Sequence, residues 1–132
     1  MGSTYNRFGE HLKAIEFYQK YLDITCEIKD RQGEGNAIGN LGTIYNTLGD
    51  QEKAIKFHTQ SLSIAREVKD RNGEAFALES LGNDYIFLDN YIKAIEYQEQ
   101  SLVINRETKN RDGERISLNN IGLTLKKQKS LT

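Results

Sequence analysis

A segment with the pattern Glu-x-Lys-Asp/Asn-Arg-x-Gly-Glu occurs three times in the chain. The three copies begin at Glu27, Glu67 and Glu107, so the offset from one copy to the next is constant. A fixed period of roughly 20–50 residues is typical of proteins that stack copies of one supersecondary unit, and this offset falls within that range. We therefore expect a linear array of repeats in which each unit packs on its neighbours.

Between these segments the apolar residues recur at spacings of three and four, which is the periodicity of an amphipathic helix. We expect two helices in each repeat, which we call type A and type B. Type A helices are expected over residues 31–48, 71–88 and 111–127, and type B helices over 10–28, 51–68 and 91–108. Residues 5–9 match the end of a type A helix at 45–49, so we expect a helix end at Gly9 as well as a left-handed helix stop at Gly49. Short polar side chains that can cap the following helix stand at Asp30, Asp50, Asp70, Asn90 and Asn110.

These helices predict an all-α fold, an α-solenoid of about six helices arranged in antiparallel pairs. Residues 5–128 form a single solenoid in this interpretation. It divides into a partial repeat (5–29), two full repeats (30–69 and 70–109) and a second partial repeat (110–128). Residues 1–4, which begin with a Met-Gly-Ser sequence typical of an expression-tag remnant, are expected to be an N-terminal tail, and residues 129–132 a C-terminal tail.

Composition excludes several classes of protein. The 132 residues carry a formal net charge of −1 with acids and bases interspersed, whereas nucleic-acid binding usually shows as a clustered basic excess. We find no apolar run near the roughly 20 residues that a membrane span needs. Cys26 is the single cysteine, so an internal disulfide is impossible, and we predict a cytoplasmic protein without nucleic-acid or membrane partners.

Within each full repeat a large apolar residue, a Leu-Gly pair and a tyrosine follow one another, and an alanine comes later, at the start of the next helix. The two sets are Ile38, Leu41-Gly42, Tyr45 and Ala54, and Leu78, Leu81-Gly82, Tyr85 and Ala94. This pattern resembles the tetratricopeptide repeat. The usual period of that repeat is about 34 residues, so the chain is similar to the longer subclass found in spindle-orientation scaffolds, kinesin light chains and bacterial signalling proteins. HEAT and armadillo repeats have a similar period, but neither requires Leu-Gly-x-x-Tyr.

Two features of the repeats bear on packing. Gly42 and Ala54, like Gly82 and Ala94, are expected to face each other and to let the paired helices approach closely. The sequence departs from the family pattern in the middle of the type B helix, where the aromatic Tyr18 is followed in the next repeats by His58 and Gln98.

The resemblance implies a non-enzymatic protein-interaction module whose ligand, a peptide or helix, lies in a concave groove lined by the type A helices. The predicted groove residues are Asn36, Asn40, Thr43, Phe76, Glu79, Asn83, Asn119 and Asn120. Asparagine carries a donor and an acceptor, so it can pair with both groups of an extended peptide backbone. The family's carboxylate-binding variant needs Lys and Arg in the groove, and the corresponding positions here lack them.

The sequence gives no signal for catalysis or for a cofactor. Neither His11 nor His58 has a spacing to Cys26 or to a carboxylate that would make a metal site. The sequence indicates no general base near Cys26. Nucleophilic catalysis by a cysteine needs such a base or a lowered thiol pKa. The charged junctions allow two interpretations, a periodic basic ridge or a ladder of surface ion pairs, of which we favour the second. We therefore predict no enzyme, no metal and no cofactor.

Two further hypotheses belong to different classes. The first is self-association through end helices that lack a partner, with Ile15, Tyr18 and Leu22 at one end and Leu118, Ile121 and Leu125 at the other. A head-to-tail contact of this kind is heterologous and can form rings or filaments. Alternatively, two molecules exchange their end helices. The second is that the array is the sensor arm of a larger signalling protein.

Overall fold

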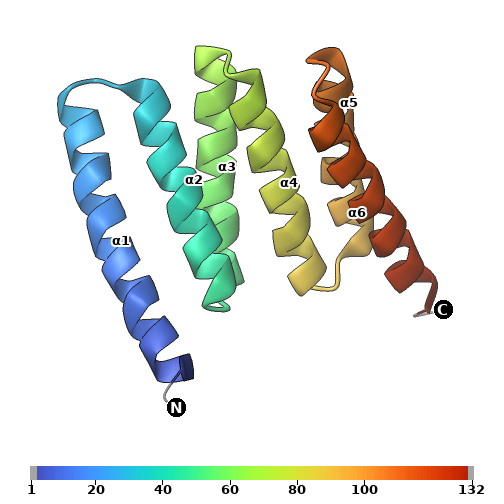
Figure 1. Ribbon diagram of the computed structural model, residues 1–132, viewed down its shortest axis with the longest axis horizontal. Helices are drawn as coiled ribbons and strands as arrows, with labels where there is room; N and C mark the ends of the chain where they lie inside the picture. Colours follow the sequence, from blue (N-terminus) through green and yellow to red (C-terminus); the bar gives the residue numbers. More distant parts are fainter. Residues whose placement is uncertain (1–2, 131–132) are drawn as a thin grey trace.

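The computed structural model describes residues 3–130, and these residues form six α-helices joined by short turns (Figure 1). The helices are α1 (Ser3–Glu27), α2 (Arg31–Thr47), α3 (Gln51–Val68), α4 (Arg71–Phe87), α5 (Tyr91–Glu107) and α6 (Arg111–Ser130). The predicted all-α solenoid is confirmed, and the ends of α2 to α5 lie close to the expected positions. Residues 1–2 and 131–132 of the two expected tails lie outside the described residues, while Ser3, Thr4, Lys129 and Ser130 belong to α1 and α6.

The helix starts are set by the capping residues that the sequence indicates. Asp30 and Asp70 each accept a hydrogen bond from the backbone N–H of a following glycine, Gly33 or Gly73, at 3.0 and 2.9 Å. A Cβ on either glycine would lie 2.5 Å from the aspartate Oδ2. The recurring Gly33 and Gly73 are therefore glycines because the cap occupies the space of a side chain.

The helix ends use left-handed residues, but mostly not glycine. Gly49 has φ +87°, as expected, whereas Lys29, Lys69 and Lys109 take the same region with φ between 58° and 61°. A non-glycine residue in this region is uncommon. These lysines are exposed, so only their backbone is constrained.

The helix end expected at Gly9 is absent, because α1 continues from Ser3 to Glu27 without a break. At the equivalent internal turns, Asp50 and Asn90 accept hydrogen bonds from the backbone N–H groups of Lys53 and Lys93. The chain carries Glu10 at this position, and glutamate is not among the short side chains that favour a helix N-cap. Gly9 alone does not end the helix.

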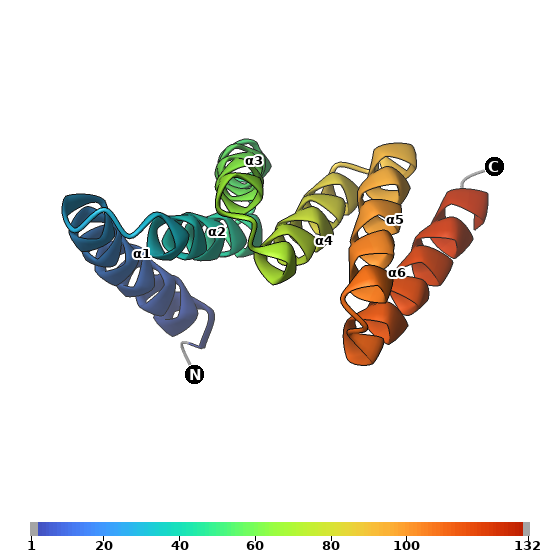
Figure 2. The same ribbon diagram turned by 90° about the horizontal axis from the view of Figure 1, so that it is seen from above.

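The six helices form a row with the two chain ends at opposite sides (Figure 1). Each helix packs against its neighbours in sequence, and α2 also contacts α4 directly. Figure 2 shows α3 set to one side, over the junction of α2 and α4. The type A helices α2 and α4 thus lie beside each other, which is the arrangement a shared groove requires.

The core lies between successive helices. One cluster of buried apolar residues comprises Leu62, Ala75, Ala77, Leu78, Leu81 and Ile104. Gly42 and Ala54 are buried, as expected, but a Cβ on Gly42 would meet the His58 ring at 2.7 Å rather than Ala54. At Gly82 the nearest atoms are Cγ of Gln98, at 3.1 Å, and the backbone oxygen of Ala94, at 3.4 Å. The two glycines mainly make room for the side chains at 58 and 98.

Within residues 3–130, the helices are all too short or too polar to cross a membrane.

Candidate functional site

Four hollows lie along the type A helices, and most of the predicted groove residues line them. Their volumes are about 320, 170, 300 and 140 Å³. Seven of the eight predicted residues take part, namely Asn36, Asn40, Thr43, Phe76, Glu79, Asn83 and Asn120. Asn119 is exposed and lines none of the four. The structure therefore brings seven of the eight predicted residues together along one surface.

The largest of these four hollows, which we call the Phe76 hollow, lies between α2 and α4 with α3 beneath it. Gly35 and Gly39 lie on one side, and Phe76, with an exposed fraction of 54%, lies on the other. Glycine at these two positions lets α2 approach α3 closely, because a Cβ on Gly39 would come within 2.9 Å of the Ser61 hydroxyl. Phe76 also lines two neighbouring hollows, which places one exposed aromatic ring at the centre of the surface.

The asparagines of this surface differ in how far they are already engaged. Asn40 and Asn83 make no side-chain hydrogen bond within the described residues. Asn120, in contrast, donates to Glu79 at 2.7 Å, and the Ser117 hydroxyl donates to the other oxygen of Glu79 at 3.2 Å. The carboxamides of Asn40 and Asn83 are thus free for a ligand, while Glu79 is used to join α4 to α6.

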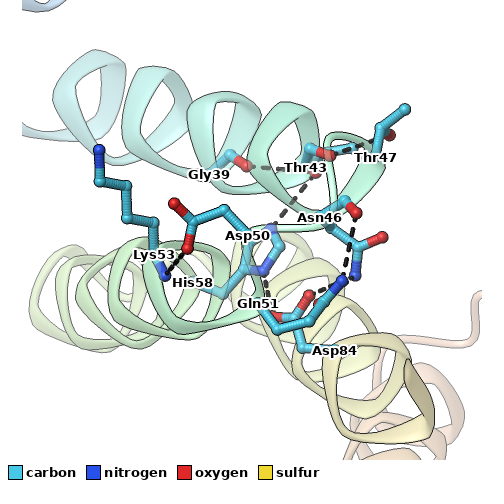
Figure 3. A network of polar contacts seen from close by, with 9 residues as sticks. All are labelled: Gly39, Thr43, Asn46, Thr47, Asp50, Gln51, Lys53, His58 and Asp84. Carbon is cyan, nitrogen blue, oxygen red and sulfur yellow. Dashed lines mark hydrogen bonds and ion pairs between the residues drawn. The ribbon is translucent and has the colours of Figure 1, made fainter. Parts of the chain in front are cut away.

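A buried polar network forms the base of the second hollow, which we call the His58 hollow (Figure 3). Nδ1 of His58 lies 2.6 Å from Oδ2 of Asp84, and both side chains are almost completely buried. Nε2 of His58 lies 3.3 Å from the Thr43 hydroxyl. Asn46 donates to Oδ1 of Asp84 at 2.6 Å and to Oε1 of Gln51 at 3.2 Å. The network thereby ties α2, α3 and α4 together.

The order hydroxyl, imidazole, carboxylate is also that of a hydrolytic triad. Two features argue for a structural role. The Thr43 hydroxyl donates back to the carbonyl of Gly39 at 3.2 Å. Thr43 also lies in the middle of α2, where backbone N–H groups bond within the helix and cannot form an oxyanion hole.

Sequence reasoning missed this network because it judged each histidine alone. The network can be recognised in the sequence when the repeats are aligned and equivalent positions are compared. His58 replaces Tyr18, and Asp84 replaces Ile44, so two polar residues enter neighbouring buried positions of the same layer. A coincident change from apolar to polar at two buried register positions is what a paired hydrogen bond requires.

The charged junctions form ion pairs between successive repeats, which is the interpretation that the sequence favours over a basic ridge. Arg31 donates two hydrogen bonds to Glu67, each 2.9 Å, and Arg71 pairs with Glu107 at the equivalent place one repeat later. The bond from Arg31 holds the pKa of the Glu67 carboxyl below its usual range. The bond to Glu107 raises the pKa of Arg71. Because these groups are exposed, the pairs fix the register of neighbouring repeats more than they add stability.

The remaining candidate residues show no cluster. Cys26 is exposed, and desolvation together with the negative charge of Glu34 raises the pKa of its thiol, so it has less thiolate than an ordinary cysteine. Residues 3–130 contain no group of three or more His, Cys, Asp or Glu side chains placed to hold a metal ion.

The most exposed apolar residues of α1 differ from the expected ones, whereas two of the three expected residues of α6 are exposed. Ile15, Tyr18 and Leu22 are half-buried. The exposed apolar stripe of this end consists instead of Phe17, Tyr21, Ile24 and Ile28. In α6, Leu118 and Leu125 are about half exposed and Ile121 is half-buried. The expected residues of α1 thus lie beside its most exposed apolar stripe, because apolar side chains cover a broad part of this helix.

Comparison with solved structures identifies similar folds, with 38 matching chains. One is a Signal Transduction ATPase with Numerous Domains (STAND) protein with a tetratricopeptide repeat sensor, from Pyrococcus horikoshii. It has a TM-score of 0.79 and 24% identity, over 86% of this chain and 18% of that one. Another is BtubC (BKLC) from P. vanneervenii, with a TM-score of 0.65 and 16% identity, over 95% of this chain and 60% of that one. The chain thus spans less than two thirds of either protein.

The search of curated proteins finds no match to the chain. The sequence model described as "Tetratricopeptide repeat" matches residues 1–67. This is about half of the chain, and the same residue pattern recurs in phase through α4 and α5. The protein belongs to the tetratricopeptide repeat family.

Proposed function

We propose that the protein binds an extended peptide of another protein along the type A helices, with an apolar side chain of the peptide seated against Phe76. The observation that supports this proposal is that the half-exposed ring of Phe76 lines three adjoining hollows. Exposed aromatic rings next to open hollows are typical anchors of binding energy. Tetratricopeptide repeats in general mediate protein–protein interaction, and the free carboxamides of Asn40 and Asn83 line hollows that adjoin the ring.

Replacing Phe76 by alanine is expected to weaken binding of a peptide selected from a random display library by at least about 2 kcal/mol, roughly thirtyfold, because the anchor and its apolar contact are lost. Asn40→Ala and Asn83→Ala are each expected to weaken it by about 1 kcal/mol. Fluorescence polarisation with the labelled peptide measures all three.

The matched control is Phe17→Ala, since Phe17 is also an exposed phenylalanine, at 66%, and lies on α1 away from the four hollows. The affinity of the Phe17→Ala variant for the peptide should equal that of the unaltered protein. Equal losses in Phe17→Ala and Phe76→Ala, or none in Phe76→Ala while the peptide still binds, would show that the peptide lies elsewhere.

A second candidate function, self-association, is favoured by the exposed stripe of α1. Inside the array, Phe57 of α3 stacks on Tyr45 of α2, with ring centroids 5.5 Å apart. Phe17 and Leu125 stand at the same two register positions on the open faces of α1 and α6. The α6 face of one copy can therefore pack on the α1 face of a second copy with the register already used inside the chain.

Light scattering over a concentration series is expected to show a mass that rises with concentration. Phe17→Glu should abolish that rise, because it buries a charge in the contact. Ile92→Glu, at an exposed position of α5, should leave the rise unchanged. A constant monomer mass up to high concentration would remove this candidate.

We also propose, as an alternative, that the array is the sensor arm of a larger signalling protein, because the Pyrococcus horikoshii protein has a tetratricopeptide repeat sensor. In that case the peptide surface is the sensing surface. The Phe76 variant then tests both functions, with loss of signalling by the parent protein as the additional readout.

A further inference from the structure

Gln98 is the feature of the structure that the proposed function leaves unexplained. Its side chain is completely buried, and neither its nitrogen nor its oxygen has a hydrogen-bond partner among the described residues. Most buried polar side chains in proteins are paired, since an unpaired one costs stability. Other buried side chains of the array, such as His58 and Asp84, are fully paired.

The lack of a partner follows from the residues that surround Gln98. Gln98 stands one repeat period after His58, so its neighbours can be compared position by position. Thr124 replaces Asp84, and its hydroxyl donates to the backbone oxygen of Asn120 at 2.8 Å instead. Ile86 replaces Asn46 and has no polar side-chain group to offer. The polar side chains around His58 therefore pair with one another, whereas the equivalent residues one repeat later leave Gln98 without a partner.

Gln98 also contributes to the lining of a hollow on the groove surface, the smallest of the four, which we call the Gln98 hollow. Ile86 and Leu123 supply apolar walls, while Asn83, Asn120 and Lys127 supply the polar part of the lining. Its volume of about 140 Å³ suits one short side chain. The hollow shares Asn83 with the His58 hollow, so it continues the surface on which the proposed peptide lies.

We propose that the Gln98 hollow is a specificity subsite that takes the side chain of an asparagine or glutamine of the bound peptide. This inference rests on the proposed function, since it names one residue type of the same ligand. A carboxamide offers one donor face and one acceptor face. Both polar atoms of Gln98 are covered in the structure, so its carboxamide has to turn toward the hollow. It then pairs with the ligand through two antiparallel hydrogen bonds, in which each nitrogen donates to the opposite oxygen.

The same geometry discriminates against the closest competitors. A glutamate carboxylate accepts only, so it pairs with the nitrogen of Gln98 and leaves the oxygen facing another acceptor. The ammonium of Lys127 also borders the hollow, but it is exposed and offsets only part of this cost. A methionine of similar size leaves both groups unpaired. A site with buried polar groups rejects a ligand that cannot pair them, and the loss of one net hydrogen bond amounts to about tenfold in affinity.

The test is a positional peptide array. Short acetylated peptides based on the selected binder carry Gln, Asn, Glu or Met at each position in turn, and binding is compared between the unaltered protein and Gln98→Met. We expect one position at which Gln or Asn is preferred over Glu and Met by about tenfold. The preference at that position should vanish in Gln98→Met, while the preferences at other positions remain.

A second probe separates this inference from the proposed function. Propionamide and propionate are titrated into ¹⁵N-labelled protein, and the Gln98 side-chain amide signals, identified by their loss in Gln98→Met, are followed by NMR. Propionamide should shift them and propionate should not. Peptide binding without a carboxamide position overturns the subsite alone. If no peptide binds, the proposed function fails, and a propionamide shift then sustains the subsite while its absence overturns it.

Discussion

Replacing His58 by leucine is expected to lower the free energy of unfolding by about 3–5 kcal/mol. Asp84 is completely buried, and His58 is the donor that satisfies its Oδ2 at 2.6 Å. Leucine fills much of the same space but leaves that oxygen as an unpaired buried charge. Urea denaturation followed by circular dichroism measures the change as a shift of the midpoint at constant slope.

Two controls distinguish loss of the pair from loss of packing. His58→Gln retains a donor toward Asp84, so it should cost clearly less than His58→Leu. The double variant His58→Leu/Asp84→Leu removes both partners, and replacing a whole buried pair by apolar groups is often close to neutral. The double variant should therefore be more stable than His58→Leu alone. If His58→Leu is as stable as the unaltered protein, the hydrogen bond from His58 to Asp84 does not stabilise the fold.

The pattern of helices could be predicted because it is repeated and local. Capping aspartates, their glycine partners and the apolar spacing recur in successive repeats, so each boundary is supported by equivalents elsewhere in the chain. The turn expected at Gly9 is wrong because it relies on the glycine alone and ignores that Glu10 is a poor cap. The left-handed lysines could not be predicted, since lysine carries no sequence signal for that conformation.

The positions of residues along the type A helices could be predicted from the sequence, whereas the buried polar contacts between helices could not, for the same physical reason. Groove residues are found from the face of a single helix, and Asn40, Phe76 and Asn83 can each be placed from their own helix. The contact between His58 and Asp84 joins two helices, α3 and α4, and depends on how they pack. It becomes visible in the sequence only when repeats are compared position by position, and then Gln98 and Thr124 appear as the corresponding layer without a charge.

Replacing Gln98 by methionine is expected to have the opposite effect from replacing His58, raising the free energy of unfolding by about 1–3 kcal/mol. Methionine has a linear side chain of similar length, so it follows the same path past Gly82. The substitution removes a donor and an acceptor that the described residues leave unpaired. Urea denaturation again measures the change, with Gln100→Met, at an exposed position of the same helix, as a control expected to lie within about 0.5 kcal/mol of the unaltered protein.

Whether Gln98→Met raises or lowers the free energy of unfolding shows whether the unpaired carboxamide is kept for ligand binding. A buried polar group that costs stability persists in proteins mainly where it serves binding or catalysis, and substitutions that relieve it commonly stabilise the fold at the expense of function. A gain in stability together with loss of the Gln or Asn preference in the peptide array would join the two observations into one trade-off. A loss of about 1 kcal/mol or more in Gln98→Met would mean that a buried water pairs the carboxamide in solution, and the hollow would then lack the open hydrogen-bonding groups on which ligand selection depends.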